Sequence, residues 1–283
     1  MKDIALGQYY SGNSILHRLD PRIKLISAIM MMVALFSAKS LWSFLFLVVL
    51  SLFLVLVSGV PLRTVLRGVR PLIFVLVFTT LFAVFMTKGT GDPLFSVKIF
   101  SWLRLEMYVE GIVRAILLSV RIVLLVITTS LFLTYTTTPT TLTDALERVL
   151  HPLTYLRVPV YDFAMMMTIA LRFIPTLVEE TDRIMCAQKA RGADFSSGSI
   201  FRRIRALVPI LIPLFVSSFR RAGELATAME CRCYRGGTGR TRLRVMRSRP
   251  GDWVFLFLAA GCLALVYLGN IFLPTVFMLG GAA

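Results

Sequence analysis

Long apolar runs dominate this sequence and are separated by short segments that carry most of its charges. A helix needs roughly 20 mainly apolar residues to cross the hydrocarbon core of a membrane. Apolar runs cover residues 25–38, 41–57, 71–86, 112–133 and 253–273. The pattern predicts an all-α polytopic membrane protein with about five transmembrane helices, numbered here as spans one to five.

The segment between spans four and five does not have the pattern of a loop. Residues 161–191 repeat apolar positions every three or four residues and become charged in their second half, which predicts one long helix. A second helix of the same design is predicted over residues 200–232, apolar from 207 to 219. We interpret both as long amphipathic coupling helices in the cytoplasm. The alternative is that residues 164–178 and 207–219 are two further short spans.

This division predicts three regions. Residues 1–139 hold spans one to four, residues 140–250 form the coupling-helix region, and residues 251–283 form the last span. Within the long helices, proline removes a backbone donor and clashes with the preceding turn. Pro175, Pro209 and Pro213 are therefore predicted bend points, or hinges.

The start of span one has a recognisable helix-start pattern. Asp20 suits the N-cap position and Pro21 the first helical position. Arg22 and Lys24 follow and are predicted to hold this end of the span at the inner membrane surface.

Charge supports a membrane protein and predicts its orientation. Hydrophobic residues make up 57% of the chain and charged residues 16%, with a formal net charge of +16, which argues against a soluble enzyme. Residues 140–250 hold 18 of the 31 basic residues and 9 of the 15 acidic ones. Because Lys and Arg near a span resist translocation, this region and the N-terminus are predicted to be cytoplasmic. An odd number of spans then places the C-terminus outside.

The sequence lacks the residues of an independent catalytic site. No Gly-x-x-x-x-Gly-Lys-Ser/Thr loop is present, so the chain is not expected to hydrolyse ATP itself. His17 and His151 are the only histidines, and Cys231-x-Cys233 lacks the spacing of a zinc site. We predict no metal site, no cofactor bound by this chain and no enzymatic activity.

Two groups of arginines invite other functions. The run Arg240, Arg242, Arg244, Arg247 and Arg249 precedes span five and is predicted to bind anionic lipid, not nucleic acid. Within span four, Arg121 is expected to pack against a neighbouring helix or partner, and Arg114 to pair with Glu110. A substrate pathway through these charges is the alternative.

Arg191 and Arg232 each stand at the end of a predicted long helix. An arginine there complements the negative end of the helix dipole, which is sufficient to explain it. Its planar, permanently charged guanidinium also suits a fixed docking contact with a protein partner. Physical reasoning alone leaves these two interpretations equally supported.

Three motifs carry a family resemblance. "GQYYSGNSILHRLDPRIKL" (7–25), "AQKARGADF" (187–195) and "AMECRCYRGGTGR" (228–240) occur in this order around the predicted spans. In these motifs the sequence resembles the transmembrane T component, EcfT, of energy-coupling factor (ECF) transporters, a branch of the ABC transporters. The resemblance implies two cytoplasmic ATPase subunits that use ATP and Mg²⁺. It also implies a membrane S component that captures a vitamin or other micronutrient.

The resemblance also implies which residues dock. Ala190-Arg191-Gly192 matches the first Ala-Arg-Gly motif of the family, whereas Cys231-Arg232-Cys233 keeps only the arginine of the second. The implied ATPase-docking set is Ala190, Arg191, Gly192, Glu230 and Arg232. Because Cys233 replaces a helix-stopping glycine, we expect the second helix to continue toward Tyr234.

The sequence thus predicts a scaffold in a bacterial or archaeal cell membrane that couples ATP hydrolysis by its partners to micronutrient uptake. The alternative is a self-contained secondary carrier driven by an ion gradient.

Overall fold

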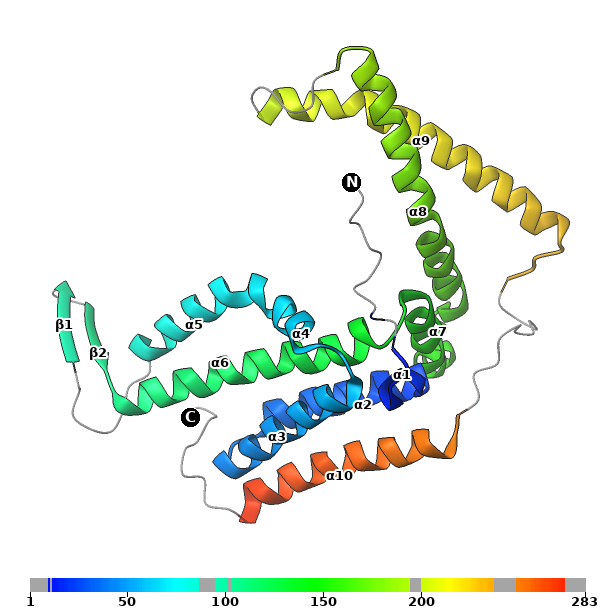
Figure 1. Cartoon of the computed structure of the whole chain (residues 1–283). Coiled ribbons are helices and arrows are strands. Elements are labelled where there is room, and N and C mark those ends of the chain that lie inside the picture. Colours follow the sequence, from blue (N-terminus) through cyan, green and yellow to red (C-terminus); the bar gives the residue numbers. More distant parts are fainter. Residues whose placement is uncertain are drawn as a thin grey trace. The chain divides into compact units, whose positions relative to one another are not determined.

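The computed structural model describes residues 10, 12–86, 95–100, 103–193, 200–236 and 248–272 (Figure 1). Its elements, in chain order, are α1 (Ile15–Arg18), α2 (Pro21–Ser37), α3 (Leu41–Ser58), α4 (Leu62–Val69), η1 (Arg70–Leu72), α5 (Ile73–Met86), β1 (Phe95–Phe100), β2 (Leu103–Met107), α6 (Val109–Thr129), η2 (Ser130–Tyr135), α7 (Pro139–Val149), η3 (His151–Leu156), α8 (Val160–Ala190), α9 (Ile200–Cys231) and α10 (Pro250–Phe272). The chain divides into two compact units. Among the described residues, the span unit comprises those from 10 to 142 and from 248 to 272, and the crossed-helix unit comprises 143–193 and 200–236.

The helices confirm the predicted all-α polytopic membrane fold. Six helical segments in the described part of the chain are long and apolar enough to cross a membrane: Leu41–Ser58, Leu62–Phe85, Val109–Tyr135, Val160–Ala190, Ile204–Cys231 and Pro250–Phe272. Two of them lie in α8 and α9, which the sequence predicted to be coupling helices. The first predicted span is α2, which has only 17 residues. Length and composition alone therefore do not decide which helices cross.

A short antiparallel hairpin was not predicted. β1 and β2 pair with Phe95 opposite Met107 and Lys98 opposite Arg104. The hairpin lies between α5 and α6, in the connection between predicted spans three and four.

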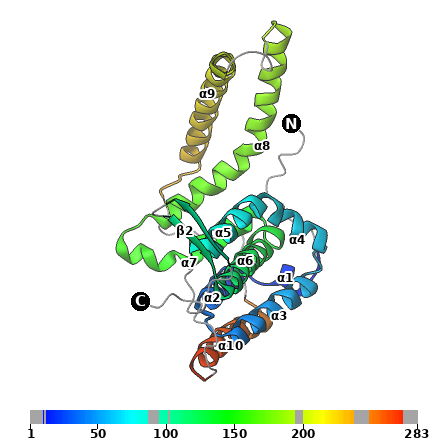
Figure 2. The same cartoon turned by 90° about the vertical axis from the view of Figure 1, so that its left-hand side faces the viewer.

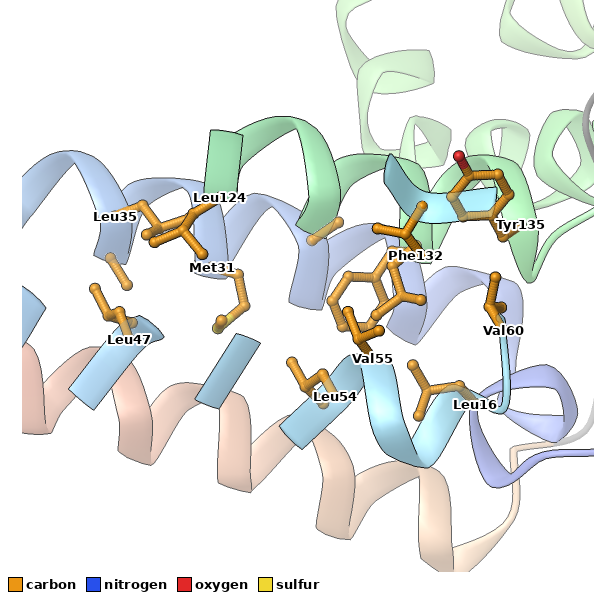
Figure 3. Packing of buried hydrophobic residues seen from close by; sticks show 14 of the residues in the cluster. Leu16, Met31, Leu35, Leu47, Leu54, Val55, Val60, Leu124, Phe132 and Tyr135 are labelled. Carbon is orange, nitrogen blue, oxygen red and sulfur yellow. The ribbon is translucent and has the colours of Figure 1, made fainter. Parts of the chain in front are cut away.

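The core of the span unit lies between α2, α3, α6 and α10. α10 packs along α2, and α6 packs along both α2 and α5. Figure 3 shows Leu16, Val60 and Tyr135 at one end of this core, and Leu35, Leu47 and Leu124 at the other. The chain turns sharply after α3 at Gly59, whose φ of 68° is in the left-handed region that glycine adopts without steric cost.

The core end marked by Tyr135, here the basic end, contains a buried polar network. Asp20 caps α2 as predicted, and its carboxylate accepts from the backbone N–H of Arg22 at 3.0 Å. Lys24 is buried instead of lying at the membrane surface, which corrects the sequence prediction. Its Nζ donates to the carbonyl oxygens of His17 at 3.2 Å and Thr136 at 2.8 Å. These bonds satisfy an amine that would be costly to bury alone.

Asp252 connects the start of α10 to this network. Its carboxylate accepts from the backbone N–H of Asp20 at 3.2 Å and of Arg249 at 2.7 Å. The second bond is the side-chain-to-N-cap contact of a capping box. One buried carboxylate therefore stabilises the α10 N-terminus and joins it to α2.

The opposite end of the span unit is also held by polar contacts. Asn270 of α10 accepts from the backbone N–H groups of Lys39 and Ser40 and donates to Ser37 O at 2.6 Å. Arg121 donates to Ala38 O at 2.6 Å, so it packs against a neighbouring helix as expected. Arg114 and Glu110 form the predicted i, i+4 pair, at 3.9 Å.

Candidate functional site

Arg191 lies at the C-cap of α8, immediately before a residue with left-handed backbone. Gly192 has φ of 85° and donates its N–H to Lys189 O at 2.9 Å. Ala193 donates its N–H to Gln188 O at 3.0 Å. These two bonds form the Schellman motif, which ends a helix by satisfying its last carbonyls. The motif places the Arg191 side chain at the tip of α8.

Arg232 lies in the same geometry at the end of α9. Cys233 has φ of 56° and donates its N–H to Glu230 O at 2.8 Å, while Tyr234 donates to Met229 O at 3.0 Å. The expectation that α9 continues toward Tyr234 is therefore wrong, because Cys233 adopts the left-handed conformation that Gly192 adopts after α8. The two arginines share one local structure although their neighbours differ.

All five predicted docking residues are exposed: Ala190, Arg191, Gly192, Glu230 and Arg232. None of the salt bridges between described residues involves them. Both guanidinium groups are therefore available to a partner. Part of each motif lies outside the described residues: Asp194 and Phe195 of the first motif, and residues 237–240 of the second.

The helices that carry the arginines run antiparallel and cross. Arg221 Nη2 of α9 lies 3.0 Å from Glu180 Oε2 of α8. Further along, Gln188 Nε2 of α8 donates to Pro209 O of α9 at 3.5 Å. Residues late in α8 therefore face residues early in α9. Figures 1 and 2 both show the end of α9 far from the end of α8.

The crossing separates the two arginine tips. Arg191 lies three residues after Gln188, which contacts Pro209, and Arg232 lies 23 residues beyond Pro209. At 1.5 Å per helical residue, this is about 35 Å along α9. The structure therefore does not bring the two predicted arginines together, and one small binding site cannot contain both.

The three hinge prolines lie inside helices that continue through them. Pro175 is within α8, and Pro209 and Pro213 are within α9, and each helix is continuous through its prolines. Pro213 has no N–H to donate to Pro209 O four residues earlier. Gln188 donates to that carbonyl instead. Sequence reasoning missed this contact and the Glu180–Arg221 pair, because neither partner is near the other in the chain.

One surface of α9 is strongly apolar. Between residues 207 and 219, its exposed large hydrophobic residues are Leu207, Val208, Leu211, Ile212, Phe215, Val216 and Phe219. Phe215 is 66% exposed, and its ring lies 4.9 Å from that of Phe219. A continuous exposed surface made of seven large apolar side chains marks a contact with a membrane or with another protein.

The histidines and cysteines have ordinary surroundings. His17 hydrogen-bonds Ser14 Oγ through Nδ1 at 2.6 Å and Tyr10 O through Nε2 at 2.9 Å. The His151 ring packs edge-on against Tyr161. Cys186, Cys231, Cys233 and Cys262 are free thiols. Among the residues that the structure describes, no three His, Cys, Asp or Glu side chains group as metal ligands.

Comparisons with known proteins agree with the resemblance in the three motifs. The profile of the CbiQ family, described as "Cobalt transport protein", matches residues 12–243. A protein of Ruminiclostridium cellulolyticum named energy-coupling factor transporter transmembrane protein EcfT is 51% identical over 247 residues, covering 87% of this chain and 90% of its own. A protein of the same name from Clostridium kluyveri is 48% identical over 254 residues, covering 90% of this chain and 92% of its own. One from Bacillus subtilis is 45% identical over 244 residues, covering 86% of this chain and 89% of its own. These similarities do not favour the secondary-carrier alternative.

Proposed function

This chain belongs to the CbiQ family, and on that basis we propose that it is the transmembrane scaffold and coupling subunit of an ECF-type ABC transporter. Relatives that match most of its length carry the name of that subunit. The chain transmits ATP hydrolysis in partner ATPases to a substrate-binding S component in the bacterial membrane. The transported substrate is a vitamin or another micronutrient, chosen by the S component.

The observation that carries this proposal is the matched pair of helix tips. Two exposed arginines occupy equivalent C-cap positions, and the helices that bear them cross so that the tips are about 35 Å apart along α9. A repeated local structure at two separate places suits two similar partners. Each arginine therefore docks on one of two cytoplasmic ATPase subunits, which hold the ATP and Mg²⁺.

The crossing suggests how motion passes through the chain. When the two ATPases approach each other on binding ATP, the tips of α8 and α9 move together and the angle at the crossing changes. Pro175, Pro209 and Pro213 lie within these helices, where missing backbone hydrogen bonds make bending easier. The exposed apolar surface of α9 moves with them, and the S component resting against it releases its substrate.

The distribution of basic residues supports a cytoplasmic N-terminus. Six arginines adjoin the basic end of the span unit: Arg18, Arg22, Arg63, Arg67, Arg70 and Arg249. The positive-inside rule places that end in the cytoplasm. α2, α3, α4–α5, α6 and α10 then cross five times and place the C-terminus outside. Counting α8 and α9 as spans gives seven, which is also odd, so this position of the C-terminus does not depend on them.

The proposal is tested by reversing the two charges in the whole complex. Arg191→Glu with Arg232→Glu is expected to abolish copurification of both ATPases and substrate uptake, while membrane insertion stays normal. Each single reversal should weaken one ATPase contact and leave the other. Arg183→Glu with Arg220→Glu is the matched control, because both arginines are exposed on the same helices away from the tips. Uptake that survives reversal of Arg191 and Arg232 would contradict the docking role.

A further inference from the structure

The short helix α4 carries a row of arginines that the coupling function does not use. Arg63, Arg67 and Arg70 are spaced i, i+4 and i+7 over α4 and the first residue of η1, and all three are exposed. At 3.6 residues per turn, this spacing places them on one side of the helix. We call these three residues the arginine row.

The other side of α4 is fixed against the span unit. Val65 and Val69 are buried, and Thr64 O accepts from the Tyr135 hydroxyl at 3.2 Å. Gly68 lies so close to Tyr135 that a Cβ there would be 2.7 Å from its hydroxyl oxygen. α4 therefore cannot rotate without losing this packing, and the arginine row points away from the unit.

The arginine row has no internal counter-charge. No salt bridge or hydrogen bond of these side chains is found within the described ranges, and no acidic residue occurs between Pro61 and Met86. Three like charges on adjacent turns repel one another. The surface is therefore complementary to a ligand that carries negative charge.

Leucines beside the arginine row distinguish the kinds of ligand. Leu62 is 54% exposed and Leu66 is 60% exposed, and they flank the arginines on one side of the helix. The same segment continues into α5, where Ile73, Phe74 and Val77 are also exposed. A soluble acidic protein would not need this apolar border, whereas a phospholipid offers phosphate and acyl chains side by side.

We propose that the arginine row binds headgroups of anionic phospholipids in the cytoplasmic leaflet, with Leu62 and Leu66 in the acyl-chain boundary. This anchor is separate from the basic run at residues 240–249. It holds the α3–α5 connection at the membrane surface. A basic residue near an anionic membrane contributes about 1 kcal/mol, which is roughly fivefold in affinity per arginine.

The experiment uses the full chain in detergent, titrated with phosphatidylglycerol or phosphatidylcholine, with bound lipids counted by native mass spectrometry. Wild type is expected to bind phosphatidylglycerol preferentially. Arg63→Gln with Arg67→Gln and Arg70→Gln should lower that affinity at least about tenfold and leave phosphatidylcholine binding unchanged. Arg157→Gln with Arg183→Gln and Arg220→Gln removes the same charge from exposed positions in the crossed-helix unit. An equal loss in this control would overturn the proposal, because the preference would follow net charge alone.

Two further variants keep the result decisive. Arg63→Lys with Arg67→Lys and Arg70→Lys retains the charge and should retain most of the preference, which separates electrostatics from misfolding. Leu62→Ser with Leu66→Ser should weaken lipid binding, because these side chains are proposed to contact the acyl chains. Water-soluble glycerol phosphate has no acyl chains and is expected to bind negligibly to the wild type and to every variant. If the glutamine variant binds lipid normally but loses the ATPases from the complex, the arginine row contacts protein and the lipid proposal is wrong.

Discussion

At the scale of single residues, the left-handed conformation of Cys233 is the clearest local cost in the docking tips. A residue with a Cβ pays about 1 kcal/mol in this region, and glycine avoids that cost. Cys233→Gly is therefore expected to stabilise the last turn of α9. Hydrogen exchange should show about fivefold greater protection of the Cys233 and Tyr234 amides, whose bonds close the Schellman motif.

Gly192 provides the matched control for this prediction. Gly192→Ala places a Cβ at φ of 85° and should reduce protection of the Gly192 and Ala193 amides. Opposite responses at two equivalent positions would identify backbone strain as the cause. Unchanged or reduced protection in Cys233→Gly would show that Cys233 costs nothing there.

A second prediction at the scale of single residues concerns Asp252. Its buried carboxylate accepts two backbone N–H groups, one at the start of α10 and one at the start of α2. Asp252→Ala leaves both donors unpaired, at a cost of about 1–3 kcal/mol each. We expect the thermal unfolding temperature of the purified chain to fall by several degrees. Glu224→Ala, which removes an exposed carboxylate from α9, should change it little.

Residues that act locally could be predicted from sequence, whereas the partners of residues that act at long range could not. Asp20 and Pro21 were assigned correctly because an N-cap depends on the next few residues alone. Lys24 was misplaced because its acceptor, Thr136 O, lies 112 positions away. The conformation of Cys233 was predicted wrongly because glycine is favoured, but not required, at a left-handed helix cap. Here the Schellman hydrogen bonds outweigh the steric cost of placing the Cys233 Cβ in that conformation.

At the scale of elements, the α8–α9 crossing is the feature that determines where both tips lie. The Glu180–Arg221 pair is partly exposed, so it contributes at most about 1 kcal/mol to stability. Its larger effect is on geometry. Glu180→Arg places two guanidinium groups together, and their repulsion should widen the angle between α8 and α9. We expect the ATPases to continue to hydrolyse ATP in this variant while substrate uptake falls, because the altered crossing no longer transmits their motion.

The exchanged pair tests that interpretation. Glu180→Arg with Arg221→Glu restores the attraction and should restore uptake, measured against ATP hydrolysis in proteoliposomes containing the whole complex. Glu179→Arg is the control for added charge, since Glu179 is exposed on the same helix. Failure of the exchange to rescue coupling would show that these residues act separately.

Helical periodicity predicted α8 and α9 well, since both are long, amphipathic and close to the expected bounds. Their antiparallel crossing could not be predicted, because it depends on contacts such as Gln188 with Pro209 O that join distant residues. The β1–β2 hairpin was missed although both strands, FSVKIF and LRLEM, alternate apolar and polar residues. The alternation covers only about five residues in each strand, and this segment was considered only as the connection between two predicted spans.

At the scale of the whole molecule, composition identifies a membrane protein but does not determine whether α8 and α9 cross the bilayer. Both are long and apolar enough to do so. If they cross, the α8 tip with Arg191 faces outward and cannot reach a cytoplasmic ATPase. The side on which this tip lies therefore decides between five spans and seven.

Cys186 allows that question to be answered with a native residue. It is exposed on α8, four residues before Ala190, and replacing Cys231, Cys233 and Cys262 by serine leaves it as the only thiol. We expect a membrane-impermeant maleimide to label Cys186 in inside-out vesicles and not in intact cells. Phe272→Cys on a chain without other cysteines should show the reverse, because α10 ends at the outer side in either count. Labelling of Cys186 in intact cells would establish α8 as a span and exclude cytoplasmic docking by Arg191. Labelling of Phe272→Cys in inside-out vesicles but not in intact cells would overturn the proposed orientation of the whole chain.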